Sequence, residues 1–374
     1  MKKSPLFIYT TRMGSYYHLT PFNQQTLNLD TCLLSAGDFF HMENTLKQLQ
    51  SETNISFRQY INQENKILYM TSIDSYKMKC VEGSSNKDGV KIAQLEGIKS
   101  VTNKQYIELA RLINPEMLVS LTEKPEIEAG QKSTKRSSSK SANFLKESLD
   151  QLKDTQIGIY GAIQGGLDTV QKITAAEEQK FAIDHPNFKG FTLYGFNQGS
   201  TWQDKEDALS VVQSVFDGYN VQYILAGYGD ILSILWGLSW GIEGFEIEEP
   251  FRFAQDLKVL LPPNFDAKDS ELEQFSSDKI NFYELEGKKI NYLNFPINSD
   301  VKENVPLNPE CKCFSCQNHT KLYISHLVEC KEMNAQVLLT IHNTYQYQKL
   351  QQKLQEMQNK KQLNQWIRWY LQFL

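Results

Sequence analysis

Three cysteines lie within six residues near the end of the sequence, at Cys311, Cys313 and Cys316. Thiolates this close together can converge on one metal ion, and structural zinc takes four sulfur or nitrogen ligands in a tetrahedron. In a reducing compartment such a cluster indicates a metal site and not a set of disulfide bonds. The fourth ligand must then come from another part of the chain.

Position alone leaves four candidates for that ligand, namely His319, His326, Cys330 and His342. His342 directly follows an apolar run at 337–341, so its imidazole is expected on a helix whose other positions are buried. A single histidine there is ordinarily a core residue with a hydrogen-bond partner, but beside three unassigned thiolates we interpret His342 as a ligand. Because nothing indicates an open coordination position, the predicted metal is one structural zinc ion per chain.

The composition is that of a soluble globular protein, since 40% of the residues are hydrophobic and 22% are charged. The formal charge of −5 argues against a protein that binds nucleic acid alone, so any RNA role needs a local basic patch or a partner. No run is long and apolar enough for a membrane span or a signal peptide. We expect a cytosolic protein without an integral membrane segment, and a peripheral contact with the mitochondrial outer membrane stays open. The cysteines outside the cluster, Cys32, Cys80 and Cys330, are predicted to be buried apolar side chains.

Short β-branched or aromatic runs alternate with amphipathic segments of helical length through most of the chain. This pattern is typical of repeated βα units that close on a parallel sheet, and it predicts an α/β barrel. The predicted strands are 6–10, 116–121, 157–163, 190–194, 222–226 and 244–247, and the predicted helices are 103–113, 143–153, 168–184, 203–217 and 229–241.

Residues 1–374 are predicted to form a single barrel domain with appended segments. The basic, serine-rich stretch 131–142 has no apolar period and is predicted to be a flexible loop. A zinc-binding subdomain is expected at 301–345, after an insertion at 263–300 whose role stays open. Residues 346–374 are expected to form a C-terminal helix whose apolar side packs either on the barrel or on a partner subunit.

The segment from Cys311 to His342 resembles the zinc site of tRNA-guanine transglycosylases, in which Cys-x-Cys-x-x-Cys is followed 26 residues later by a histidine. Other elements of that family match in the same order: Thr10-Thr11-Arg12, His18-Leu19-Thr20-Pro21, Ile163-Gln164-Gly165-Gly166, Gly195 and the run Gly241-Ile242-Glu243-Gly244-Phe245-Glu246. The resemblance implies a (β/α)₈ TIM barrel with a zinc-binding subdomain inserted near the C-terminus. It also implies an aspartate nucleophile that attacks ribose C1′ of guanosine 34 in the tRNA anticodon, so that guanine is exchanged for another base, in eukaryotes queuine.

The residues that carry this chemistry in the family are altered here. The nucleophile position holds Glu246, and moving a carboxylate by about 1 Å can cost on the order of 10²-fold in rate. The loop that follows holds Phe251 and Phe253, which implies a reshaped surface beside the site. The segment 35–39 is a poor match for the element that supplies the second carboxylate, and Thr122-Glu123-Lys124 replaces the base-recognition aspartate.

An intact zinc motif with an altered catalytic set resembles the non-catalytic, accessory members of the family. The resemblance then implies a heterodimer with a separate catalytic subunit, formed through surfaces near the zinc subdomain, and tRNA bound through the complex. We predict no catalytic residue in this chain. A separate hypothesis is that Lys132, Lys135 and Arg136 contact tRNA. Two alternatives remain: an active transglycosylase that uses Glu246 as its nucleophile, and a zinc-stabilised module that binds RNA or free queuine.

Overall fold

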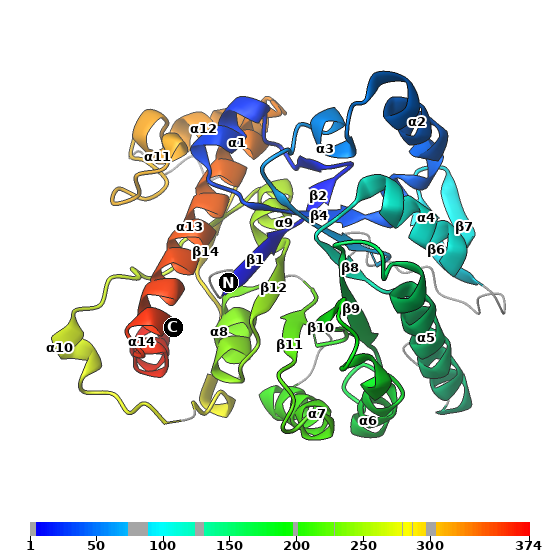
Figure 1. Ribbon diagram of the computed structural model, residues 1–374. Coiled ribbons are helices and arrows are strands. Elements are labelled where there is room, and N and C mark those ends of the chain that lie inside the picture. The colour runs from blue at the N-terminus through cyan, green and yellow to red at the C-terminus, as the bar shows by residue number, and fades with distance from the viewer. Residues whose placement is uncertain are drawn as a thin grey trace.

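Eight parallel strands form one sheet that curls into a barrel in the computed structural model (Figure 1). The structure describes residues 5–73, 89–123, 131–196, 201–227, 229–278, 280–285, 287–296 and 304–374, with only the backbone at 131–134 and 284. Around the sheet the strands are ordered β1 (Leu6–Tyr9), β12 (Gly244–Ile247), β11 (Gln222–Leu225), β10 (Phe188–Leu193), β9 (Gly158–Ile163), β8 (Met117–Val119), β5 (Ile67–Thr71) and β4 (Thr31–Ser35).

The barrel closes between the first and last strands of this order. Thr10 and Leu33 form a parallel bridge. The Thr31 hydroxyl accepts a hydrogen bond from the Tyr9 amide at 3.1 Å and donates one to the Phe7 carbonyl at 2.6 Å, so a side chain ties the two edges together. The predicted TIM barrel is therefore confirmed. Two of its strands, β4 and β5, are not among those that the sequence patterns predict.

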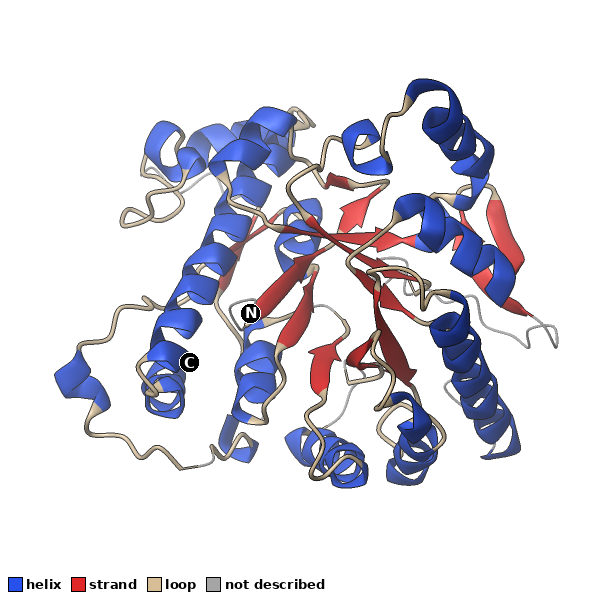
Figure 2. Cartoon of the chain, viewed as in Figure 1, coloured by secondary structure: helices blue, strands red, loops and turns tan. Residues whose placement is uncertain are grey.

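Four of the helices that cover the barrel begin at side-chain caps. Thr102 and Thr201 form capping boxes, and Asp168 and Asp230 accept hydrogen bonds from the first turn of their helices, which satisfies amide groups that a helix leaves unpaired. The helices in this outer layer are α4 (Asn103–Ile113), α5 (Gln131–Gln151), α6 (Thr169–Glu177), α7 (Trp202–Val215) and α8 (Ile231–Ser239), which surround the strands in Figure 2. No helix in the described ranges has the length and apolar character that a membrane crossing requires.

Smaller elements complete the fold. Hairpins are formed by β2 (Thr11–Arg12) with β3 (Ser15–Tyr16) and by β6 (Gly89–Gln94) with β7 (Gly97–Thr102), and β13 (Lys258–Leu260) pairs with β14 (Tyr292–Asn294). The short helices are α1 (Pro21–Thr26), α2 (Glu43–Gln48), α3 (Phe57–Tyr60), α9 (Glu249–Gln255), α10 (Asp269–Leu272), α11 (Phe314–Asn318) and α12 (Lys321–Glu329).

The predicted flexible loop at 131–142 is wrong, because these residues form the first half of α5. The serine hydroxyls that suggested a solvated loop are used inside the protein. Ser137 donates to the Glu123 carbonyl at 3.0 Å, and the Ser141 hydroxyl lies 3.0 Å from that of Thr122. Small side chains that can hydrogen-bond let the helix pack closely on the end of β8, so tertiary contacts outweigh a composition that favours a loop.

The single C-terminal helix predicted at 346–374 is also wrong. The structure has α13 (Asn334–Asn359) and α14 (Leu363–Leu371), and the chain turns at Lys361, whose φ is +58°. Hydrogen bonds from the Lys361 and Gln362 amides to carbonyls in the last turn of α13 end that helix. The turn lets α14 pack against α8, α10 and α13, so the apolar side of this region packs within the chain.

Candidate metal centre and barrel mouth

Cys311, Cys313, Cys316 and His342 converge at one buried point. Their potential ligand atoms all lie within 4.8 Å of one another. The three sulfur atoms are 3.7, 3.6 and 3.2 Å from Nδ1 of His342. The cysteines come from the loop that leads into α11 and from α11 itself, whereas the histidine comes from α13. The structure therefore contains a Cys₃His cluster at metal-binding distances.

The imidazole of His342 is oriented so that Nδ1 faces the sulfur atoms. Its other nitrogen, Nε2, lies 2.9 Å from the Leu260 carbonyl oxygen, which can only accept a hydrogen bond. Nε2 must therefore carry a proton, so in the neutral imidazole the lone pair lies on Nδ1, as a metal ligand requires. Because the sulfur atoms contact one another, the pKa of Cys311 is lowered whereas that of Cys313 is raised. Three cysteine sulfur atoms and one imidazole nitrogen form a donor set compatible with zinc.

The other candidates for the fourth ligand are used elsewhere. His319 stacks on Tyr323 with ring centroids 5.2 Å apart. His326 contacts Cys330 one turn later on α12, with Sγ 3.7 Å from Nδ1, and Cys330 is exposed, so its predicted burial is wrong. Cys32 is buried as predicted. Cys80 lies outside the described residues.

Glu246 is fully buried on β12, inside the barrel. Its carboxylate accepts a hydrogen bond from the Tyr69 hydroxyl at 3.3 Å and one from the Gly227 amide at 3.2 Å. The Tyr69 hydroxyl also lies 3.0 Å from that of Thr192. Burial, and then the charge of Glu246, raise the pKa of Tyr69 well above its usual value, so this phenol stays protonated and can donate. The side chain at the nucleophile position is thus enclosed by aromatic and hydroxyl groups.

The polar side chains expected near a bound base contact one another. Gln164 is buried and donates to the Thr122 hydroxyl at 3.5 Å, and that hydroxyl lies 3.0 Å from Ser141 on α5. Gly165 and Gly166, which follow Gln164, form a tight turn. A β-carbon on Gly195 would lie 2.7 Å from Cα of Gly166, and Gly166 and Gly195 both have positive φ. This region is therefore internally hydrogen-bonded and closely packed.

The other two altered segments are also part of the interior. Asp38 in the poorly matching segment 35–39 is buried and accepts a hydrogen bond from the Met13 amide at 3.2 Å. Phe251 lies in α9 and packs between Tyr9 and Tyr16, with each ring pair 6.4 Å apart. This altered segment thus forms a short helix, and the Phe251 ring packs it against the interior.

Sequence reasoning missed a buried pair formed by Glu249 on α9 and Tyr347 on α13. Their side chains are in short hydrogen-bond contact, and the Tyr347 hydroxyl also lies 2.8 Å from the Gly229 carbonyl. Burial, together with the nearby charge of Asp230, raises the pKa of Glu249 to about 8. The sequence signal for this pair was Glu249 itself. It is the third glutamate in a span of four residues and directly precedes Pro250, at a strand end where apolar residues are expected.

These features define a class of protein: a (β/α)₈ barrel with a buried Cys₃His cluster beside its C-terminal helices. The family described as Queuine tRNA-ribosyltransferase matches residues 2–373, and the chain belongs to that family.

Relatives of two kinds are similar to the chain. The Queuine tRNA-ribosyltransferase accessory subunit 2 of Anopheles gambiae is 23% identical over 359 residues, which cover 92% of this chain and 78% of that protein. The protein of the same name from Drosophila sechellia is 23% identical over 368 residues, 95% of this chain and 82% of the relative. The Queuine tRNA-ribosyltransferase of Thermodesulfovibrio yellowstonii is 22% identical over 294 residues, 78% of this chain and 66% of the relative.

Proposed function

We propose that this chain is the non-catalytic subunit of a heterodimeric queuine tRNA-ribosyltransferase. A separate catalytic subunit then exchanges guanine for queuine at position 34 of tRNA anticodons, and this chain positions that subunit and the tRNA. The observation that carries the proposal is the enclosure of Glu246, which is 0% exposed and accepts hydrogen bonds from Tyr69 and Gly227. The printed names of the two insect relatives, which call them accessory subunits, support the same role.

Enclosure matters because a carboxylate nucleophile has to come within about 3 to 3.5 Å of the ribose carbon that it attacks. Tyr69, Thr192 and the backbone of Gly227 occupy the space around Glu246 in the described part of the barrel. Gln164 and Thr122, which lie where a base would be recognised, hydrogen-bond to each other instead. Access would require displacing several buried side chains, each with a partner of its own.

We also propose that the Cys₃His cluster holds one structural zinc ion. Cys311, Cys313, Cys316 and His342 would be its four ligands, and the donor set leaves no position for a substrate. The ion would contribute folding free energy by joining the loop before α11 to α13. Its ligands Cys311 and His342 are 31 residues apart in sequence.

A surface next to this cluster fits the catalytic subunit as partner. Phe314 on α11 and Leu322 and Tyr323 on α12 are 46%, 36% and 44% exposed, although all three are large and apolar or aromatic. Such exposed side chains are typical of protein interfaces. We refer to these three residues as the α11–α12 surface and propose that it contacts the catalytic subunit.

The tRNA contacts proposed for this chain lie on α5. Lys135 and Arg136 are exposed there, and the side chain of Lys132 lies outside the described residues. A variant with all three residues changed to glutamate should lower the tRNA affinity of the heterodimer. Unchanged affinity would remove α5 from the proposed tRNA interface.

The experiment that tests the proposed function measures guanine exchange on tRNA in three reactions: this chain alone, a catalytic queuine tRNA-ribosyltransferase subunit alone, and both mixed. Activity that requires mixing, and that survives Glu246→Ala in this chain, supports the accessory role. Exchange by this chain alone that Glu246→Ala abolishes would identify an active transglycosylase instead. Binding of RNA or free queuine without any need for the catalytic subunit would favour an independent binding module.

A further inference from the structure

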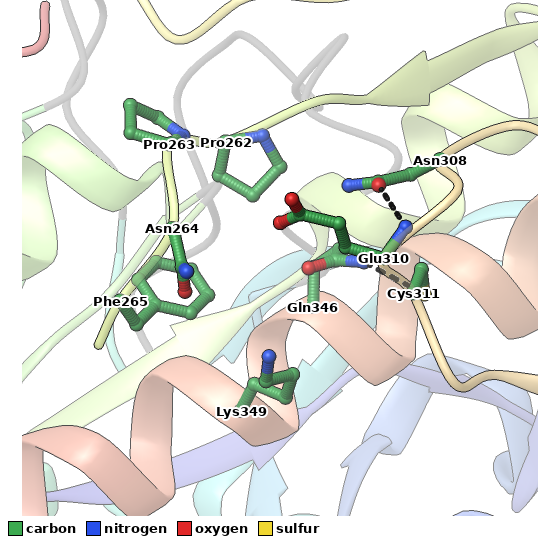
Figure 3. Close-up of a pocket in the computed structure, with 9 residues that line it drawn as sticks. All are labelled: Pro262, Pro263, Asn264, Phe265, Asn308, Glu310, Cys311, Gln346 and Lys349. Carbon is green, nitrogen blue, oxygen red and sulfur yellow. Dashed lines mark hydrogen bonds between the residues drawn. The ribbon is translucent and has the colours of Figure 1, made fainter.

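A small polar cavity adjoins the candidate metal centre (Figure 3). Its volume is about 140 Å³, enough for a few water molecules. Of the four residues in the Cys₃His cluster, Cys311 lines this cavity, together with Glu310, Gln346 and Lys349. Cys311 is thus the residue of the cluster that this cavity adjoins.

Gln346 links this sulfur to helix α13. Its side-chain amide Nε2 donates a hydrogen bond to Sγ of Cys311 at 3.2 Å, drawn as a dashed line in Figure 3. Only 5% of Gln346 is exposed, so its side chain is held in place by packing. It follows His342 by four residues on α13, and residues with that spacing share one face of a helix. The same helix face therefore presents a histidine to the cluster and an amide donor to one of its cysteines.

We propose that Gln346 is a positioning residue of the metal centre: it holds the Cys311 thiolate in its ligand geometry and shields it from the cavity. The inference rests on the proposed zinc site. Three thiolates and a neutral imidazole around a divalent ion leave a net charge of −1 in a buried environment, which donors to sulfur stabilise. Backbone amides lie near two of the sulfur atoms, with the Cys316 amide 3.4 Å from Cys313 and the Cys313 amide 3.5 Å from Cys311. The Gln346 contact is shorter than either.

The test begins with the zinc content of the purified wild-type chain, followed by competition for zinc with a chelator of known affinity. Gln346→Met keeps the length of the side chain and removes the donor. Gln346→Glu keeps the shape and places an acceptor against the thiolate. Lys349→Met is the matched control, because Lys349 lies on the same helix and lines the same cavity. We expect about a 10- to 100-fold loss of zinc affinity for Gln346→Met, a larger loss for Gln346→Glu, and the wild-type value for Lys349→Met.

A second readout separates positioning from general destabilisation. With cobalt(II) in place of zinc, Gln346→Met should shift the thiolate charge-transfer absorption, while Lys349→Met should give the wild-type spectrum. If the wild-type chain holds no zinc, both the proposed metal site and this inference fail. If it holds one zinc and the Gln346 variants match Lys349→Met in affinity and spectrum, only the role of Gln346 is overturned.

Discussion

The buried carboxyl of Glu249 should make the stability of this protein depend on pH near neutrality. Tyr347 has one hydroxyl proton but two neighbouring acceptors, the Gly229 carbonyl and the Glu249 carboxyl. If Tyr347 donates to Gly229, the short contact with Glu249 is satisfied when Glu249 carries a proton and donates it to the phenol oxygen. A protonated carboxyl can thus satisfy this contact, and burial, followed by the charge of Asp230, raises the pKa of Glu249 to about 8.

The sign of the effect follows from that pKa. An acid whose pKa rises from 4.5 in the unfolded chain to about 8 in the folded protein stabilises the fold fully below pH 4.5 and loses this contribution as the pH rises toward 8. The difference corresponds to about 5 kcal/mol at most, and to about 3 kcal/mol between pH 5 and pH 7. Burial is the main cause of the raised pKa of Glu249 and the charge of Asp230 adds to it, whereas the hydrogen bond with Tyr347 and the charge of Arg252 oppose the rise.

The perturbation that isolates this effect is Glu249→Gln, which keeps the hydrogen-bonding shape and cannot ionise. We expect the variant to gain stability over the wild type by about 3 kcal/mol between pH 5 and pH 7, as measured by urea unfolding at each pH with the same metal supply. Glu177→Gln on the exposed side of α6 is the control and should follow the wild type. A constant difference between Glu249→Gln and the wild type from pH 5 to pH 8 would refute a protonated Glu249.

Three further outcomes are expected. Cys316→Ser should abolish stoichiometric zinc binding and lower the melting temperature, whereas a strong chelator should reproduce that loss in the wild type but change the variant little. Gly195→Ala should destabilise the fold by about 2 kcal/mol in urea unfolding, because the φ of Gly195 is +89° and the added carbon would lie 2.7 Å from the Gly166 backbone. Gly218→Ala should destabilise the fold less, because Gly218 has a similar φ of +80° but open space around it. Tyr323→Asp in the α11–α12 surface should weaken binding of the catalytic subunit at least tenfold by titration calorimetry without changing the melting temperature, and equal affinity would remove that surface from the interface.

The sequence could predict the barrel because its later strands are short apolar runs separated by clear helical periods. It could not identify β4 and β5, since buried five-residue runs such as 31–35 do not differ in pattern from part of a buried helix. The stretch 131–142 resembles a loop in sequence because it is basic, rich in serine and without an apolar period. Its helix depends on contacts with Thr122 and Glu123, which no local pattern contains.

The candidate site was predictable to a different degree in its two parts. Three cysteines in six residues predict most of the Cys₃His cluster, and the apolar run before His342 favours that histidine as the fourth member. The orientation of its ring could not be predicted, because it depends on the path of α13 past the Leu260 carbonyl. The enclosure of Glu246 could not be inferred at all. It results from Tyr69 on β5, which is 177 residues away in sequence and reaches Glu246 across the interior of the closed barrel.

Helix α13 gives a physical reason for an intact Cys₃His cluster in a chain whose Glu246 is enclosed. His342 contacts the cluster and the Leu260 carbonyl, while the adjacent Asn343 accepts from the Leu260 amide at 2.9 Å and donates to the Pro250 carbonyl at 3.2 Å. Four residues further along, Tyr347 contacts Glu249 and the loop after β11. A metal ion that fixes His342 would therefore fix the start of α9 and the barrel end through consecutive turns of one helix. Such a brace would preserve the shape of the chain whether or not Glu246 performs chemistry, so an enclosed Glu246 is compatible with an intact Cys₃His cluster.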